Sequence, residues 1–233
     1  LPVLLGYDLG YGLYGLVFIN GLRFIWLSGM VFKYSEIKFS KSFLREFLSL
    51  SGPLVLSILL SGSAQYIDGI LVSFKFDEAT LAVFRYGARE LPFFVLLLDA
   101  FGNAVTPQFS DPENRESALK ELKIGTARMM KWIFPSSVIL ILTSKFLFPI
   151  VFNPDFVESS IIFNIYLLII ITRFLFTRIV LIGLKNTKPI FWSSLIEIII
   201  NVFLSVIFIQ FWGIAGVAIA TVIADCVSAS LVT

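Results

Sequence analysis

The chain is built from long runs of apolar residues that short polar connections separate. Several runs reach the roughly 20 residues that a helix needs to cross about 30 Å of hydrocarbon. They do not alternate between apolar and polar positions, as the strands of a transmembrane β-barrel do. The pattern predicts an all-α fold, a polytopic transmembrane helix bundle of about seven spans. We place these spans at residues 9–31, 50–73, 81–107, 130–152, 158–184, 188–210 and 213–233.

Basic residues are concentrated in every other connection. Because loops rich in Lys and Arg stay in the cytoplasm, these connections are predicted to be cytoplasmic, and the first span runs inward. In the first of them, residues 39–48 (FSKSFLREFL) carry Phe at every fourth position. This spacing predicts an amphipathic helix on the membrane surface, with a short solvated linker helix as the alternative. The basic connections are residues 32–49, 108–129 and 185–188.

Composition supports a membrane protein and excludes several other classes. Hydrophobic residues make up 58% of the chain, above the roughly 45–50% of a soluble domain. The absence of His and the single Cys, Cys226, exclude a disulfide framework, a zinc site and most His-based catalysis. The net charge of +2 is too small to indicate a nucleic-acid partner. Since no nucleophile–base pair or phosphate-binding loop is present, we expect neither an enzyme nor a cofactor.

One face of the third apolar segment is polar. Polar residues recur there at steps of three and four, which places them on one side of a helix. Pro92 removes a backbone hydrogen bond and predicts a bend in this helix. Because polar groups inside a membrane face protein or water, the stripe predicts a surface turned toward a cavity or a neighbouring helix. Its members are Arg85, Arg89, Pro92, Leu96, Asp99 and Asn103.

Arg85 and Arg89 indicate a contact with an anion, because paired guanidinium groups suit phosphate. An ion pair between Arg85 and Asp68 of the second segment is the alternative, since both are about equally far from the turn between their segments. Asp99 either lines a hydrated cavity or makes a polar contact near the inner face. Asp68 belongs to a second polar stripe, which comprises Ser57, Ser61, Gln65 and Asp68.

The last three predicted spans bring further ionisable residues to one depth. Glu197 and Asp225 are equally distant from the turn near Phe211, and Arg173 reaches a similar level across the preceding turn. Two close carboxylates cannot both ionise readily at low dielectric, so they predict a shared proton or a bound cation. A structural cluster neutralised by Arg173 is the alternative. We expect Arg178, nearer the cytoplasmic end, to extend to the interface. The stripe that contains Glu197 comprises Ser193, Glu197, Asn201 and Ser205.

Three stretches resemble a known superfamily of exporters. Residues 66–94 (YIDGILVSFKFDEATLAVFRYGARELPFF) resemble the seventh-to-eighth helix region of polysaccharide flippases. Residues 103–111 (NAVTPQFSD) resemble the end of that eighth helix, and residues 210–229 (QFWGIAGVAIATVIADCVSA) resemble the opening of the final helix of the core. The chain is thus similar to the multidrug/oligosaccharidyl-lipid/polysaccharide (MOP) exporter superfamily, and within it to the O-antigen and capsule flippases. It differs in having Gly69 after Asp68, where many relatives have Arg.

The resemblance implies two six-helix lobes around a central cavity that opens alternately to the two sides of the membrane. Residues 1–31 would be the last helix of the first lobe, 32–49 a cytoplasmic amphipathic linker, and 50–233 the six-helix second lobe. Because the chain begins without Met and both ends lie near apolar segments, we expect a fragment of a longer protein. The missing first lobe would be its partner, in a bacterial or archaeal cytoplasmic membrane.

The resemblance also implies a function. The protein would flip an undecaprenyl-diphosphate-linked oligosaccharide from the inner to the outer leaflet during the synthesis of surface polysaccharide. Its partners would be this lipid-linked oligosaccharide and the membrane lipids. The cavity residues that would contact the cargo are Arg85, Arg89, Asp99, Asn103, Asp68 and Gln65. Coupling to a gradient of Na⁺ or H⁺, which some relatives use, would involve Glu197, Asn201, Asp225 and Arg173.

Two other functions remain open. An ion-coupled exporter of small molecules, like the multidrug exporters of the same superfamily, would need acidic cavity residues and few basic ones. A membrane glycosyltransferase or polysaccharide ligase would need a large extracytoplasmic loop with catalytic residues, whereas the outer connections here are short. The stripe with Arg85 and Arg89 favours the flippase.

Overall fold

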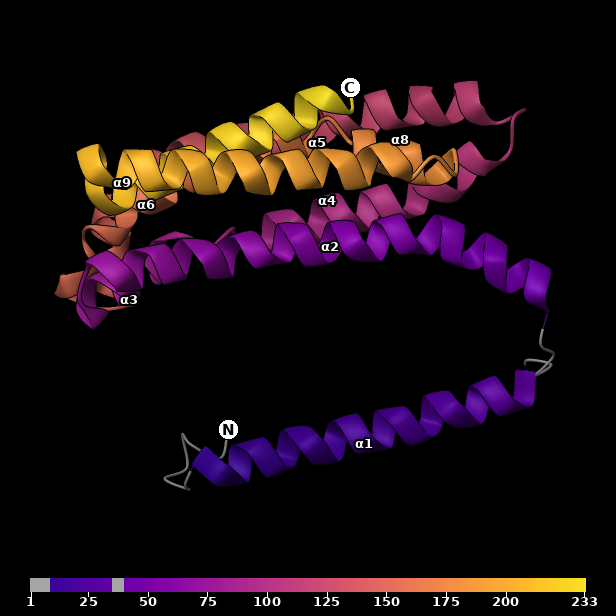
Figure 1. Ribbon diagram of the computed structural model, residues 1–233, viewed down its shortest axis with the longest axis horizontal. Helices are drawn as coiled ribbons and strands as arrows, with labels where there is room; N and C mark the ends of the chain where they lie inside the picture. The colour runs from indigo at the N-terminus through magenta and orange to yellow at the C-terminus, as the bar shows by residue number, and fades with distance from the viewer. Residues whose placement is uncertain (1–8, 35–39) are drawn as a thin grey trace. The chain divides into compact units, whose positions relative to one another are not determined.

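The computed structural model describes residues 9–34 and 40–233, apart from the side chains of Leu9, Tyr11 and Gln65. Every element in this part of the chain is helical, as the sequence predicts (Figure 1). Five helices are long and apolar enough to cross a membrane. The seven predicted segments correspond to these five because the last long helix contains two segments and the third segment is divided into helices too short to count. The interrupted stretch Ser159–Gly183 counts as one of the five.

The chain divides into two compact units, Leu1–Arg45 and Glu46–Thr233. Helix α1 (Leu9–Tyr34) lies in the first unit and is rich in apolar residues. Helix α2 (Lys41–Lys75) continues without interruption from the amphipathic stretch into the second predicted span. The described part of that stretch therefore forms the first turns of α2. The boundaries drawn from the sequence at 31/32 and 49/50 stay predictions.

The third predicted span is not one bent helix. It consists of α3 (Glu78–Gly87), α4 (Pro92–Val105) and the short 3₁₀ helix η2 (Thr106–Ser110). Pro92 begins α4 instead of bending a continuous helix, because a first-turn residue needs no intrahelical N–H bond. The periodicity that joined Arg85 to Asp99 as one stripe is therefore interrupted between them.

The fourth and fifth predicted spans also differ from single membrane-length helices. Helix α5 (Arg115–Val151) has 37 residues and begins well before the predicted span. The fifth span is divided into α6 (Ser159–Tyr166), α7 (Ile169–Arg173) and α8 (Thr177–Gly183). The interruption before α8 includes Phe176, whose φ of 50° is in the left-handed region. The third and the fifth predicted spans thus contain non-helical segments inside the bundle.

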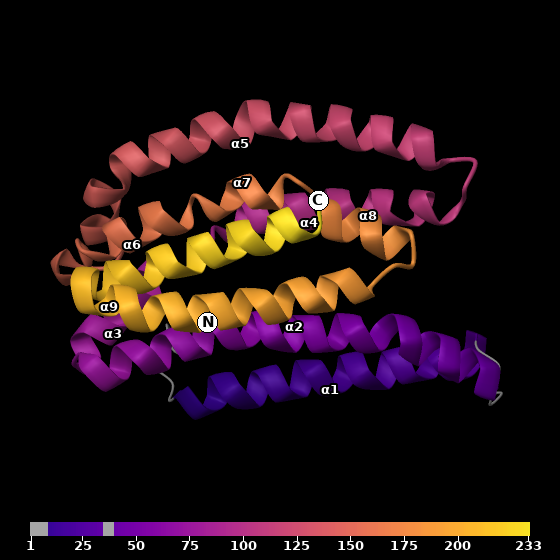
Figure 2. The ribbon, with the colours of Figure 1, turned by 45° about the horizontal axis from the view of Figure 1, so that its top comes forward.

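Helix α9 (Lys188–Leu231) contains the last two predicted spans as two arms joined by a sharp turn. At Gly213 the backbone has φ 57° and ψ −137°, and the arms on either side run antiparallel (Figure 2). A side chain at Gly216 would place its Cβ 2.3 Å from the backbone oxygen of Phe208 in the other arm. The close approach of the arms therefore requires glycine, and small residues continue the face. The buried members of this face are Gly216, Ala220, Ala224 and Ser228.

The connections of the second unit lie at two opposite ends of the bundle. The connection before α5 and that between α8 and α9 lie at one end, whereas the α2–α3, α5–α6 and α9 turns lie at the other (Figure 2). The connections at the first end are the ones rich in basic residues, so we call this end of the bundle the basic end. Its hydrophobic core includes Phe94, Phe109, Leu122 and Phe176, and a separate core at the other end includes Val72, Phe84, Ile162 and Val217. The predicted alternation of the connections agrees with this arrangement.

Candidate functional site: a charged pocket beside a buried polar site

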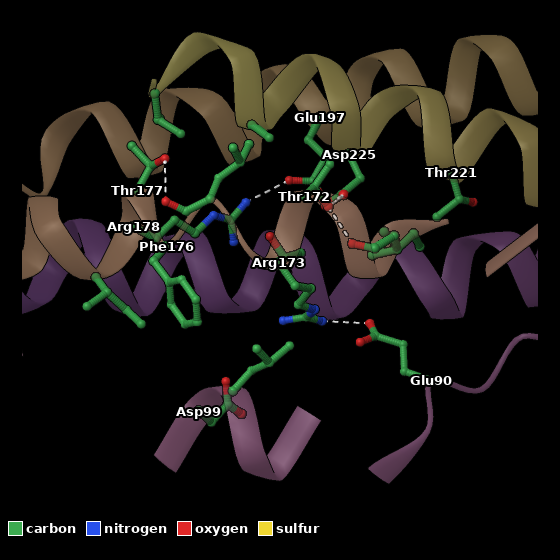
Figure 3. Close-up of a pocket in the computed structure, with 18 of the residues that line it drawn as sticks. Glu90, Asp99, Thr172, Arg173, Phe176, Thr177, Arg178, Glu197, Thr221 and Asp225 are labelled. Atoms are coloured by element: carbon green, nitrogen blue, oxygen red, sulfur yellow. Dashed lines mark hydrogen bonds and ion pairs between the residues drawn. The ribbon is translucent and has the colours of Figure 1, made fainter. Parts of the chain in front are cut away.

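A cavity of about 280 Å³ opens where the interrupted helices meet α9 (Figure 3). Its walls come from α2, from the segment between α3 and α4, from α4, from α6, α7 and α8, and from both arms of α9. Helix interruptions leave backbone and side chains free to face inward, which suits a polar cavity at membrane depth. Six charged residues line the cavity, namely Glu90, Asp99, Arg173, Arg178, Glu197 and Asp225.

Arg173, the last residue of α7, forms an ion pair with Glu90. Its Nη2 lies 2.6 Å from Oε1 of Glu90, and the side chains are 41% and 24% exposed. Glu90 lies between α3 and α4, where the helix is interrupted and the carboxylate is directed at α7 (Figure 3). The ion pair therefore joins two interrupted spans.

Arg178 of α8 forms a second ion pair, with Glu197 of α9. Its Nη2 lies 2.9 Å from Oε2 of Glu197 and donates to the hydroxyl of Ser228 at 3.3 Å. The expectation that Arg178 extends to the interface is therefore wrong. The left-handed conformation of Phe176 precedes α8, so the direction of this side chain could not follow from counting along one helix.

Asp225 accepts a hydrogen bond from the hydroxyl of Thr172 and lines the pocket beside both ion pairs. The predicted cluster of Glu197, Arg173 and Asp225 is thus correct in place and wrong in pairing. Arg173 pairs with Glu90, and Glu197 pairs with Arg178. Asp99 lines the same cavity, and the choice between its two predicted roles stays a prediction.

A buried polar site lies next to the pocket, where α2 meets the two arms of α9. Asp68 has no exposed surface, and its Oδ2 accepts a hydrogen bond from the Thr221 hydroxyl at 2.8 Å. Asn201 donates from Nδ2 to the same Thr221 oxygen at 2.9 Å. The Tyr166 hydroxyl donates a long bond of 3.5 Å to Asp68. Thr221 and Tyr166 also line the pocket, so the two sites adjoin.

Two oxygens of this site have no hydrogen-bond partner. They are Oδ1 of Asp68 and Oδ1 of Asn201, and both are buried. Buried oxygens without a partner are costly, so these two are available to a ligand. Among the residues that the structure describes, Asp68 forms no ion pair, and no group of three His, Cys, Asp or Glu side chains is placed to hold a metal ion. Carboxylate, amide and hydroxyl oxygens are the ligands that hard cations take.

The two arginines predicted to contact an anion lie near these sites without joining them. Arg85 lies over Gly69, with its Nη2 3.1 Å from where a Cβ would be, and the alternative ion pair with Asp68 does not form. Arg89 stacks on the Tyr86 ring, with its Cζ 5.3 Å from the ring centroid. It lines a small cleft next to Glu90 and Arg173. Asn103 is exposed and lines none of these cavities.

Several site residues were outside the sequence prediction. Glu90 lay off the predicted stripe, and Thr172, Tyr166 and Thr221 were not considered. For Glu90 the sequence did contain a signal. A helix tends to end just before a proline, so a carboxylate two residues before Pro92 can leave the helix and face a partner in another element. Asp68 and Asn201, predicted for cargo and for ion coupling respectively, lie in one site. The Gln65 side chain lies outside the described residues.

The chain is similar to known flippases. The sequence model of the family described as lipid II flippase MurJ matches residues 10–233. No curated protein sequence matches the chain. A solved structure of lipid II flippase MurJ in an inward closed conformation has a TM-score of 0.65 and 22% identity, over 84% of this chain and 44% of that one.

Solved transporters of the MOP superfamily are similar to a comparable degree. An outward-facing multidrug resistance MATE family transporter has a TM-score of 0.65 and 17% identity, over 80% of this chain and 43% of its own. A Pyrococcus furiosus MOP transporter, for which reverse polarity of the binding pocket suggests a different function, has a TM-score of 0.62 and 17% identity, with the same coverage. These identities show the shared fold, and this chain spans less than half of each structure.

Proposed function

Because the chain belongs to the lipid II flippase MurJ family, we propose that it forms the second half of a transporter for a lipid-linked saccharide diphosphate. The superfamily is the one that the sequence resemblance indicated. The O-antigen and capsule branch, and with it the identity of the sugar, stays a prediction. Membership in a flippase family supports transport and not catalysis.

The observation that carries the proposal is the pair of half-exposed guanidinium groups in the pocket. Arg173 and Arg178 each keep 41% of the side chain exposed although each is paired with a glutamate. A diphosphate offers oxygens that suit guanidinium donors at least as well as a carboxylate does. We infer that the cargo exchanges with the glutamates at one or both arginines. Arg89, in the adjoining cleft, would supply a third positive charge.

The buried polar site supports coupling to a cation gradient. The proposed ligands are Asp68, Asn201 and Thr221, which replace Glu197 and Asp225 as our candidates for this role. We favour Na⁺ over a proton because a proton requires one donor and one acceptor, whereas four side-chain oxygens from three helical segments meet here. A bound Na⁺ would neutralise the Asp68 carboxylate and draw on the transmembrane ion gradient.

A second function, export of a small organic cation, has one observation in its favour. The pocket has four carboxylates and two guanidinium groups, so carboxylates are in excess. An excess of carboxylates suits a cationic cargo, as expected for the multidrug exporter alternative. The two functions differ in what happens when the pocket arginines are removed, because an anionic cargo needs them and a cationic one does not.

The experiment uses the full-length protein in vesicles with an outward-to-inward Na⁺ gradient. A fluorescent undecaprenyl-diphosphate saccharide reports lipid movement, and a dye cation reports the alternative. For Arg173→Gln and Arg178→Gln we expect at least about tenfold slower lipid movement, as for loss of a charged hydrogen bond to the cargo. Lys145→Gln, an exposed charge change on α5 outside these cavities, is the matched control.

Two results would contradict the proposal. Normal lipid movement in both arginine variants would remove the pocket from the cargo path. Movement of the dye cation, with no movement of the lipid by the unaltered protein, would favour the exporter. Insertion of each variant is checked by its yield and elution profile after purification.

A further inference from the structure

A second cavity lies at the basic end, outside the transport path described above. It is a groove of about 340 Å³ between Phe101 of α4 and the first four turns of α5. Its residues on α5 follow one face of the helix, because they recur at steps of three and four. They are Ser117, Lys120, Glu121, Ile124, Gly125 and Arg128.

The floor of the groove is apolar and depends on a glycine. The Phe101 ring occupies the space of a side chain at Gly125, since a Cβ there would lie 2.1 Å from Cζ of Phe101. The other edge of this ring meets Phe176, with ring centroids 5.6 Å apart. Ile124 is 52% exposed and continues the apolar surface. The floor is thus fixed by packing and remains accessible from outside.

The rim of the groove is positively charged. Lys120 and Arg128 are exposed, and in the part of the chain that the structure covers neither is within ion-pair distance of a carboxylate. The one acid of the groove, Glu121, accepts a hydrogen bond from the Gln108 amide at 2.9 Å. The groove therefore combines two available cations with an apolar floor.

The position of the groove along α5 matches the level of lipid headgroups. Helix α5 has 37 residues, or about 55 Å, whereas hydrocarbon needs only about 20 residues. Trp132 is 78% exposed at the start of the apolar part, and tryptophan favours the membrane–water interface. Arg128 precedes it by one turn. The cations of the groove thus lie at or beyond the headgroup layer on the basic end.

We propose that this groove binds an anionic phospholipid of the leaflet at the basic end. Lys120 and Arg128 hold the headgroup phosphate, and Ile124 with Phe101 contacts the first part of an acyl chain. Basic pockets between transmembrane helices on this side of a membrane suit anionic headgroups. Through the contact of Phe101 with Phe176, the bound lipid adjoins a residue that lines the charged pocket.

The test is native mass spectrometry of the full-length protein released from lipid nanodiscs. The nanodiscs contain phosphatidylcholine alone or with one fifth phosphatidylglycerol, and the readout is the number and affinity of retained lipids. We expect one retained phosphatidylglycerol. We also expect about thirty-fold weaker binding in the K120Q/R128Q double variant, because each of these two side chains loses a direct contact with the headgroup phosphate that is worth roughly fivefold in affinity.

Two controls separate a built site from general charge attraction. K123Q/K131Q removes the same charge from the same helix at residues that do not line the groove, and it should leave the retained lipid unchanged. Ile124→Ser should weaken retention of the lipid while leaving any binding of soluble glycerol phosphate unchanged. Equal loss in both double variants, or equal retention of phosphatidylcholine, would overturn the proposal. Displacement of phosphatidylglycerol by the saccharide diphosphate lipid would also overturn it, since the groove would then be part of the cargo path.

Discussion

The charged pocket and the buried polar site differ in the partners and in the exposure of their carboxylates. In the pocket, Glu90 and Glu197 each lie within 3 Å of a guanidinium nitrogen and keep partial contact with solvent. In the buried site, Asp68 has no exposed surface, receives only hydroxyl donors and keeps an unpaired oxygen. The two sites are adjacent, so the difference does not come from depth alone.

This difference assigns separate tasks to the two sites. An internal ion pair neutralises its own charges, so Glu90 and Glu197 need no cation from outside the chain, and their arginines can exchange partners with a cargo. A buried carboxylate without a cation is costly in low dielectric. In our proposal the coupling ion supplies the positive charge that balances the Asp68 carboxylate.

The largest expected effect comes from Asp68→Asn, which keeps the shape of the side chain and removes its charge. We expect transport of the lipid-linked cargo to fall at least about tenfold and to lose its dependence on Na⁺, because the amide cannot balance a cation. The measurement is lipid movement in vesicles with and without a Na⁺ gradient. Asp225→Asn in the pocket is the matched control. If both variants respond equally to Na⁺, the distinction between the two sites fails.

The next effect concerns the close approach of the two α9 arms. Gly216→Ala would press a Cβ against the Phe208 carbonyl oxygen and displace the arm that carries Thr221 from the arm that carries Asn201. We expect the free energy of unfolding to fall by about 1–3 kcal/mol, as in overpacked cores, and Na⁺ affinity to fall with it. Thermal unfolding in detergent at several Na⁺ concentrations measures both. Gly62→Ala, where a Cβ has open space, is the control. Unchanged Na⁺ affinity in Gly216→Ala would separate the arms from the ion site.

A smaller effect tests whether the pocket ion pairs are structural. For Glu90 and Arg173 we expect a coupling energy of about 0.5–1 kcal/mol in a double-mutant cycle, because both side chains are partly exposed. The cycle uses Glu90→Gln, Arg173→Gln and the double variant, with thermal unfolding as the readout. A coupling of several kcal/mol would show that the pair holds the interrupted helices together and is not free to exchange with cargo.

The smallest effect concerns Asp77, an exposed carboxylate that caps α3. Hydrogen bonds from the Thr80 side chain and then from its backbone N–H lower the pKa of Asp77. A lowered pKa means that the capping contribution is present above the ordinary carboxyl pKa and is lost as pH falls through the lowered value. Asp77→Ala should therefore reduce the melting temperature slightly at pH 7 and not at about pH 2–3. A difference that is independent of pH would contradict this assignment.

Much of the architecture could be predicted from the sequence. The apolar segments, the alternation of basic connections and the small-residue face of the last arm follow from local patterns that lipid imposes. Counting residues from each turn also placed Glu197, Asp225 and Arg173 at one depth, and the structure has all three in one pocket. Depth is additive along a helix, so this part of the prediction needs no knowledge of neighbours.

The pairings within the site could not be predicted in the same way. A partner depends on which helices are adjacent and on where a helix is interrupted, and both are tertiary properties. The interruption before Pro92 turns Glu90 toward Arg173, and the left-handed Phe176 turns Arg178 toward Glu197. Residues 174–176 are apolar, so hydropathy does not show the interruption before α8, whereas the interruption before Pro92 contains Arg89 and Glu90.

The most direct test of the account is a Na⁺ titration of the full-length protein, followed by thermal unfolding and by binding of radioactive ²²Na⁺. We predict a saturable, Na⁺-specific rise in melting temperature that K⁺ does not reproduce. It should be absent in Asp68→Asn, reduced in Asn201→Ala and retained in Asp225→Asn. A rise of equal size in Asp68→Asn would contradict the account, as would stability that responds to pH but not to Na⁺.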